Sequence, residues 1–234
     1  MDSGSNWRDL ASAATEELQQ ASSRLFSEWN PAGPSGQPPA AQMVISDSSN
    51  RPITMDDLGD KGEQEIGIAR NEIYARHGRS FSKPEYANHF NNQPWYQPNP
   101  NYRDSELSPV EQRNLLFLHT IEMDYDMNGQ RNAFKTDASV QPNLPGSLIA
   151  DSSHRKLEDD EINALSPQQL RQAINEINAR NGYMFKNADW QNYFQQFPWY
   201  QAKANFSERD LSWLEERNVE KLKIRELDLQ LGAR

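Results

Sequence analysis

The segment NEIYARHGRSF, residues 71–81, places three side chains with possible chemistry within four positions: Tyr74, Arg76 and His77. The histidine could serve as a general base, the arginine could hold an anion and the tyrosine could donate a hydrogen bond. A helix end explains the same residue types, because basic side chains favour the last turn and a glycine often follows it. We favour this structural interpretation, in which Arg76 pairs with Glu72 and His77 caps the last carbonyls.

A second copy of this pattern, NEINARNGYMF, occupies residues 175–185, at an offset of 104 positions (71 to 175). The same offset relates ISDSSNRPIT (45–54) to IADSSHRKLE (149–158), and the Pro-Trp-Tyr segment at 94–96 to that at 198–200. So many matches at one offset indicate two tandem copies of a single structural unit.

The second copy keeps the arginine, as Arg180, but has Asn178 and Asn181 where the first copy has Tyr74 and His77. The unit therefore folds without that tyrosine and that histidine, which supports the structural interpretation. The same observation leaves the alternative open, because the first copy could retain the two side chains for a function that the second copy lacks.

The Pro-Trp-Tyr segments offer a second kind of candidate site. Trp95, Tyr96, Trp199 and Tyr200 could stack on sugar rings or form hot spots for a protein partner. We favour a structural role for the two tryptophans, because a small domain needs large aromatic side chains to bury enough surface. The two tyrosines are expected to keep their hydroxyl groups in water.

Asparagines also recur at matched positions, as Asn71 with Asn175 and as Asn114 with Asn218. An asparagine at equivalent places in two helices is a candidate for a buried hydrogen bond between those helices, which would fix their register. A contact with a ligand is the alternative, and we favour the structural bond because buried polar groups are normally satisfied within the protein.

Composition excludes several function classes. The net charge of −10 and a pI of about 4.9 argue against nucleic acid and against anionic membrane surfaces. No cysteine is present, so disulfides and thiolate metal sites are excluded. We expect no metal and no cofactor, since the sequence lacks a phosphate-binding glycine loop and no histidine pair has ligand spacing. The histidines are His77, His89, His119 and His154.

Helix signals dominate both copies and predict an all-α fold of two small three-helix domains. Each copy should hold a helix that ends at Gly78 or Gly182, and a short second helix over 83–91 or 187–195. The third helix begins with a capping box, Ser108-Pro-Val-Glu111 or Ser212-Trp-Leu-Glu215. A short extended lead-in is expected at 44–45 and 148–149.

Pro/Gly-rich segments divide the chain. We expect an N-terminal amphipathic helix (1–29), a linker (30–43), a first domain (44–125), a second linker (126–147) and a second domain (148–234). Apolar residues at alternating steps of four and three predict that the N-terminal helix docks on a repeat or on a partner helix. The sequence shows no membrane-spanning stretch and no signal peptide, as expected of a cytosolic protein or of a fragment without its targeting segment.

The stretch ARNEIYARHG (69–78), followed by an aromatic residue, a short helix, a WY turn and a helix bearing Arg113-Asn114, resembles the YARHG domain family. The lead-in DSSNR (47–51) is also similar to what often precedes that motif. INEINARNG (174–182) departs from the motif at Asn178 and Asn181. The resemblance implies a bacterial protein outside the cytoplasmic membrane, with an enzymatic or wall-binding role.

The leading hypothesis is a non-enzymatic binding module of the bacterial envelope that recognises cell-wall material or a protein. One alternative is an enzyme, such as a hydrolase, centred on Tyr74, Arg76 and His77, and another is a cytosolic interaction or scaffold protein. The candidate binding residues are Tyr74, Arg76, His77, Trp95, Tyr96, Arg180, Trp199 and Tyr200.

Overall fold

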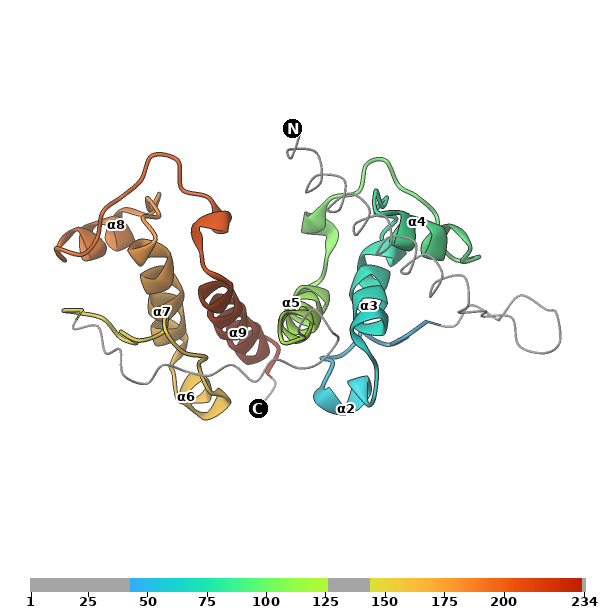
Figure 1. The fold of residues 1–234 in the computed structure, drawn as a ribbon, viewed down its shortest axis with the longest axis horizontal. Helices are drawn as coiled ribbons and strands as arrows, with labels where there is room; N and C mark the ends of the chain where they lie inside the picture. The colour runs from blue at the N-terminus through green and yellow to red at the C-terminus, as the bar shows by residue number, and fades with distance from the viewer. Residues whose placement is uncertain (1–42, 126–143, 233–234) are drawn as a thin grey trace, which may run out of the picture. The chain divides into compact units, whose positions relative to one another are not determined.

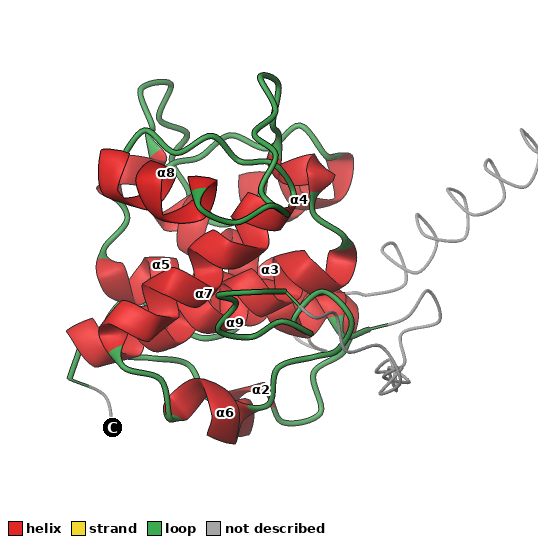
Figure 2. Cartoon of the chain, turned by 90° about the vertical axis from the view of Figure 1, so that its left-hand side faces the viewer, coloured by secondary structure: helices red, strands yellow, loops and turns green. Residues whose placement is uncertain are grey.

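The computed structural model describes residues 43–125 and 144–232. Helices and loops make up these residues, and Figure 2 shows no β-strand among them, which confirms the predicted all-α class. The expected N-terminal helix over 1–29 lies outside the described residues.

Both copies follow one order of elements. The first contains α2 (Met55–Leu58), α3 (Glu63–Arg76), α4 (Pro84–Asn91), the 3-10 turn η1 (Asp104–Glu106) and α5 (Pro109–Met123). The second contains α6 (Asp159–Asn163), α7 (Pro167–Arg180), α8 (Ala188–Gln195), η2 (Glu208–Asp210) and α9 (Trp213–Gln230). The three helices expected for each copy are present, and the short helices α2 and α6 are additions to that prediction. The expected extended lead-ins are instead bends that continue into turns.

Capping chemistry sets where the long helices begin. The side chain of Ser108 accepts a hydrogen bond from the backbone N–H of Glu111, and the Glu111 carboxylate accepts one from the backbone N–H of Ser108. Ser212 and Glu215 form the same reciprocal pair at the start of α9. Both capping boxes predicted from the sequence are therefore confirmed.

The described residues fall into two compact units, and the smaller one is Ser80–Tyr96. It contains α4, and its centre is the fully buried ring of Phe90. The Phe81 ring stacks on Phe90 at 4.8 Å between centroids, and Trp95 and Tyr96 contact Phe90 at 6.1 and 6.0 Å.

The larger unit holds all the other described elements, and two of its apolar cores have a matching design. In the first, one face of α3 meets α5, and Ile66, Ala69 and Ile73 are buried as their spacing predicts. In the second, α7 meets α9 through the equivalent Leu170, Ala173 and Ile177.

Within this larger unit, α5 of the first repeat lies beside α9 of the second (Figure 1). Arg113 on α5 pairs with Asp228 on α9 at 2.9 Å, and Arg217 on α9 pairs with Asp124 at the end of α5, also at 2.9 Å. At the offset of 104 positions, Arg113 corresponds to Arg217, and Asp124 corresponds to Asp228. Each ion pair is therefore the counterpart of the other, as in a two-fold symmetric interface.

Candidate functional site

The segment NEIYARHGRSF, residues 71–81, forms the end of α3 and the turn that follows it. Gly78 follows the helix with a φ of +81°, and its N–H donates to the Ala75 carbonyl at 2.9 Å. A Cβ at this position would lie 2.6 Å from the carbonyl oxygen of Gln97, so the close approach of the returning chain requires a glycine. Gly182 repeats the arrangement after α7 with a φ of +92°. The left-handed helix stops predicted from the sequence are confirmed.

Arg76 binds the segment that precedes α2, residues 44–54, which we call the lead-in segment. Its guanidinium donates to the hydroxyl oxygens of Ser48 and Ser49 at 2.8 and 3.0 Å, and to the Ile45 carbonyl at 2.8 Å. It also pairs with the Glu72 carboxylate one turn earlier, as predicted. These contacts occupy the terminal nitrogens of the guanidinium, and only 15% of the side chain is exposed.

Arg180 makes the same set of contacts in the second repeat. Its guanidinium donates to Ser152 and Ser153 at 2.9 Å each and to the Ile149 carbonyl at 2.7 Å, and it pairs with Glu176. Because Arg76 and Arg180 have equivalent partners in the two copies, this arginine has a structural role in the repeat.

Glu72 also binds the lead-in segment. Its carboxylate accepts a hydrogen bond from the backbone N–H of Val44 at 2.7 Å, and the residue is 2% exposed. Burial raises the pKa of Glu72, and the bonds from Val44 and Arg76 oppose that rise. The lead-in is thus held by two charged side chains of α3.

His77 reaches across to the start of α5 and does not cap the carbonyls of α3 as predicted. Its Nε2 lies 2.8 Å from a carboxylate oxygen of Glu111, the residue of the capping box. In the second repeat the side-chain amide of Asn181 donates to Glu215 at 3.0 Å. Histidine and asparagine therefore make equivalent contacts at this position.

The Glu111 carboxylate accepts several hydrogen bonds. Burial raises its pKa, but hydrogen bonds from His77, from Ser108 and from Ser49 outweigh that effect, so the pKa is lowered. The pKa of Glu215 is lowered in the same way, with Asn181 and Ser153 among its donors. Both carboxylates serve as anchors that join three segments of their repeat.

Tyr74 lies half-buried against the first core, with the Arg79 guanidinium 4.3 Å from the centre of its ring. At the matching position of the second repeat, Asn178 donates to the Ile174 carbonyl of its own helix at 3.1 Å. The tyrosine ring is therefore a packing element of the first repeat that the second repeat lacks.

The matched asparagines bind the lead-in segment, and the predicted bonds between helices are wrong. The side-chain amide of Asn114 donates to the carbonyls of Ser48 and Arg51, and its oxygen accepts from the Ile53 N–H. Asn218 makes the equivalent three bonds. Asn71, by contrast, donates to the Gly67 carbonyl within its own helix.

The Pro-Trp-Tyr segments pack into aromatic clusters. In the second repeat the indole N–H of Trp199 donates to the Pro145 carbonyl at 3.0 Å. The Tyr200 hydroxyl donates to the Tyr183 carbonyl at 2.9 Å, which differs from the water-exposed hydroxyl that we predicted. In the smaller unit, burial raises the pKa of Tyr96, which also has a hydrogen bond with Ser80.

A broader aromatic surface surrounds Trp199. We name it the aromatic cap and define it as the half-buried residues Tyr183, Trp190, Tyr193, Phe197, Trp199 and Tyr200, packed over Phe185 and Phe194. The rings of Phe197 and Trp199 stack nearly parallel, with centroids 5.6 Å apart and an angle of 5°. Met184 lies between two residues of this cluster in the chain and is 53% exposed.

Sequence reasoning found only Trp199 and Tyr200 as candidate site residues of the cap. The signal for the rest was available, because aromatic residues fall at 190, 193, 194 and 197, the spacing of one helical face.

Among the described residues, no helix has both the length and the apolar character needed to cross a membrane.

Comparison with known families agrees with this architecture. Searches of curated proteins and of solved structures gave no match. The model of the YARHG domain family matches residues 41–122 and again residues 146–226, which together make up more than half of the chain. The two matched segments contain the two helix ends described above, with Arg76 and Arg180 in equivalent positions. The chain therefore belongs to the YARHG domain family, of which it carries two tandem copies.

Proposed function

We propose that this protein is a non-enzymatic binding module of the bacterial envelope, which recognises cell-wall material or a protein partner through the aromatic cap of its second repeat. The observation that carries the proposal is the cap itself, in which six aromatic side chains stay partly exposed beside the exposed Met184.

Such a surface suits ligands with apolar faces. Tryptophan and tyrosine stack on sugar rings and dominate the energetics of protein interfaces, and methionine adapts to irregular partners. The rings of the cap are held in place by hydrogen bonds from Trp199 and Tyr200 to backbone carbonyls. A rigid aromatic surface loses little conformational entropy when it binds.

The alternative of an enzyme centred on Tyr74, Arg76 and His77 has weaker support. The Arg76 guanidinium is engaged by the lead-in and Glu72, and Arg180 repeats those contacts in the other repeat. His77 bonds to a carboxylate that also caps α5, and an asparagine replaces it in the second repeat. These contacts support a role in assembling the repeat.

The other alternative is a cytosolic interaction or scaffold protein, with the N-terminal helix expected over 1–29 as its docking element, and it differs from the envelope module in compartment. Members of the YARHG family are generally extracytoplasmic. We therefore prefer the envelope, with peptidoglycan or an envelope protein as the ligand.

The test is a pull-down on purified peptidoglycan, run in parallel with a proteomic pull-down that uses the immobilised full chain. Met184→Glu places a charge between Tyr183 and Phe185 in the chain at an exposed position, so it should leave folding intact and weaken binding about tenfold or more. Met55→Glu is the matched control, because Met55 is also exposed, at 43%, and lies outside the cap.

Binding that survives Met184→Glu and Trp199→Ala unchanged would place the ligand elsewhere and contradict the role of the cap. Failure to retain either wall material or any protein would contradict the proposal as a whole.

A further inference from the structure

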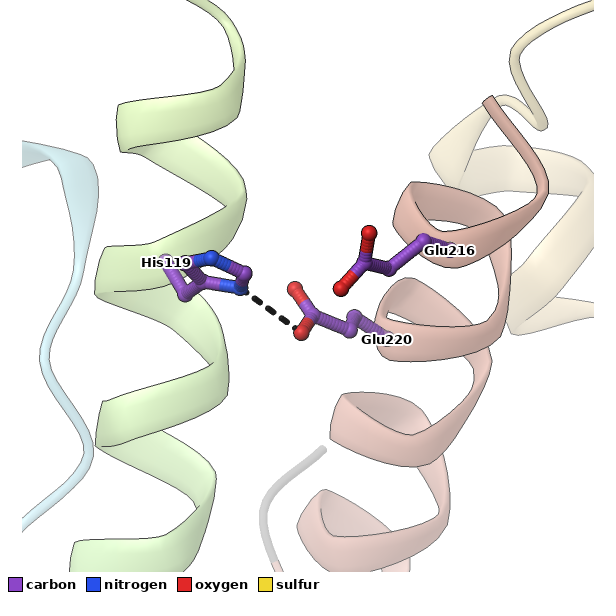
Figure 3. A group of neighbouring side chains, drawn as sticks. All are labelled: His119, Glu216 and Glu220. Atoms are coloured by element: carbon purple, nitrogen blue, oxygen red, sulfur yellow. Dashed lines mark hydrogen bonds and ion pairs between the residues drawn. The ribbon is translucent and has the colours of Figure 1, made fainter. Parts of the chain in front are cut away.

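Three potential metal ligands meet where α5 of the first repeat lies beside α9 of the second. His119 comes from α5, and Glu216 and Glu220 come from α9 (Figure 3). The Nδ1 atom of His119 lies 2.8 Å from one carboxylate oxygen of Glu220. One ligand atom from each of the three residues lies within 4.8 Å of the other two.

The helix geometry explains this convergence. Glu216 and Glu220 are four residues apart, so they project from one face of α9, and the contact between α9 and α5 brings that face to His119. The ends of the interface are fixed by the reciprocal ion pairs of Arg113 and Arg217.

A second observation is the free carboxylate oxygen of Glu220. Glu220 is only 9% exposed, and its Oε2 atom is buried without a hydrogen-bond partner. Figure 3 shows this oxygen on the side of Glu220 that faces His119 and Glu216. A buried carboxylate oxygen is normally satisfied by a donor or a cation, so this atom points to an additional ligand.

The charges around the cluster also favour a cation. Arg70 is a basic side chain whose charge acts on His119, and its guanidinium is paired with Glu122 at 2.6 Å. The carboxylates of Glu216 and Glu220 are thus not balanced by that arginine.

We propose that His119, Glu216 and Glu220 bind a divalent transition-metal ion, with Zn²⁺ as the natural probe, and that the ion joins the two repeats. One imidazole nitrogen and two carboxylate oxygens suit Zn²⁺ or a similar ion better than Mg²⁺ or Ca²⁺, which prefer oxygen ligands throughout. Three protein ligands leave a fourth coordination position to water.

Binding requires a small closure of the cluster. Ligand bonds to zinc measure about 2.0–2.2 Å, so two ligand atoms on one ion are at most about 4.4 Å apart. The exposed side chain of Glu216 can turn inward to supply this movement. The ion would replace the hydrogen that His119 and Glu220 share, and a ligand proton would pass to the solvent.

The internal repeat predicts a single site in each chain. The positions equivalent to Glu216, Glu220 and His119 are Gln112, Leu116 and Lys223. A lysine and a leucine cannot hold a divalent cation at neutral pH. Two-fold equivalence therefore holds for the ion pairs and is broken at the ligand cluster.

From the sequence we expected no metal site, and the proposed site differs from that expectation. His119 and Glu216 are 97 positions apart (119 to 216), so no local spacing could reveal the cluster. The proposed ligands are not members of the aromatic cap, so the proposal is independent of the proposed function.

The experiment uses the full chain without a polyhistidine tag, stripped with a chelator and titrated with Zn²⁺ by calorimetry at about pH 7.5. We expect one ion per chain and an upward shift of the melting temperature on binding. Glu216→Gln should weaken binding at least tenfold while the metal-free protein melts as the wild type does, because Glu216 is exposed.

Glu226→Gln is the matched control, since it removes the same charge from the same helix at a residue that pairs with Arg171. It should leave zinc affinity unchanged. His119→Gln should weaken binding as Glu216→Gln does. The proposal is overturned if the wild-type chain takes up no zinc, or if Glu216→Gln and His119→Gln bind zinc as tightly as Glu226→Gln does.

Discussion

Arg76 and Glu72 illustrate how the motif residues stabilise the repeat. Arg76→Ala would leave the Glu72 carboxylate buried without its charged partner and would release the lead-in from α3. We expect a loss of about 3–5 kcal/mol in the free energy of unfolding, measured by urea denaturation. Arg103→Ala, at an exposed position, should change the stability by no more than about 0.5 kcal/mol. Equal effects of the two substitutions would contradict the structural role of Arg76.

His77 gives a sharper test, because the second repeat already contains the substitution. His77→Asn should keep the stability within about 1 kcal/mol of the wild type, since Asn181 makes the same contact with Glu215. Glu111→Ala should cost distinctly more, because it removes the partner of His77 and the capping box together. Thermal denaturation of both variants measures the difference. A large loss in His77→Asn would show that the two side chains are not equivalent.

Contacts between side chains could be predicted only where the two residues lie close in the chain. The pairing of Arg76 with Glu72 was predictable because the two residues are one helical turn apart. The bond from His77 to Glu111 was not, because 34 positions separate them. The partners of Asn114 were missed for another reason. The lead-in has no regular secondary structure to satisfy its backbone groups, so a side chain from α5 takes that role.

The turn after α3 depends on a glycine. Gly78→Ala should destabilise the protein by about 1–3 kcal/mol, because it combines a positive φ with a clash against the chain at Gln97. Gly59 also has a positive φ, of +52°, but a Cβ there meets nothing within 4 Å. Gly59→Ala should therefore cost less than Gly78→Ala in the same urea denaturation series. The reverse order would contradict the steric argument.

Helix boundaries were the most predictable part of the fold. Capping boxes and a terminal glycine are local signals, and they placed the starts of α5 and α9 and the end of α7 closely. The one-turn helices α2 and α6 were missed because four or five residues are too few to show a periodic pattern. The aromatic cap was only partly predicted, since its members come from α8 and from the non-helical segments on either side of it.

Asp124 links the first repeat to the second through Arg217 at 2.9 Å and Lys156 at 2.6 Å. Burial raises the pKa of Asp124, but the bonds from Arg217 and Lys156 outweigh that effect and lower the pKa. The folded-state pKa thus lies below the unfolded value of about 3.9. The contribution of Asp124 to stability is complete above the unfolded value and is lost as the pH falls through the folded one.

Asp124→Asn should therefore lower the free energy of unfolding by about 1.5–3 kcal/mol at pH 7. Its effect should shrink as the pH falls below about 4, because the wild-type carboxylate becomes protonated there. Urea denaturation at a series of pH values measures both effects, with Asp60→Asn as a control at an exposed position. A loss that is independent of pH would contradict the assignment of this ion pair.

The contact between α5 and α9 could not be predicted from the sequence. Arg113, Asp124 and Arg217 read as ordinary charged residues of solvent-exposed helix faces. The repeat identifies equivalent positions but not which helix faces meet, because each copy alone has the same pattern. Only the structure shows that equivalent charges pair across the two copies.

The reciprocal pairs have a consequence for how such a chain can diverge. In a homodimer of single repeats, every substitution at the interface appears twice, so a change that suits one half must suit the other. Joining the two copies in one polypeptide removes that coupling, and each half accumulates substitutions independently. The chain bears the result of this freedom, with His119 on one helix and Lys223 at the matching place on the other. Gene duplication thereby turns a symmetric contact into a place where a single, one-sided feature can arise.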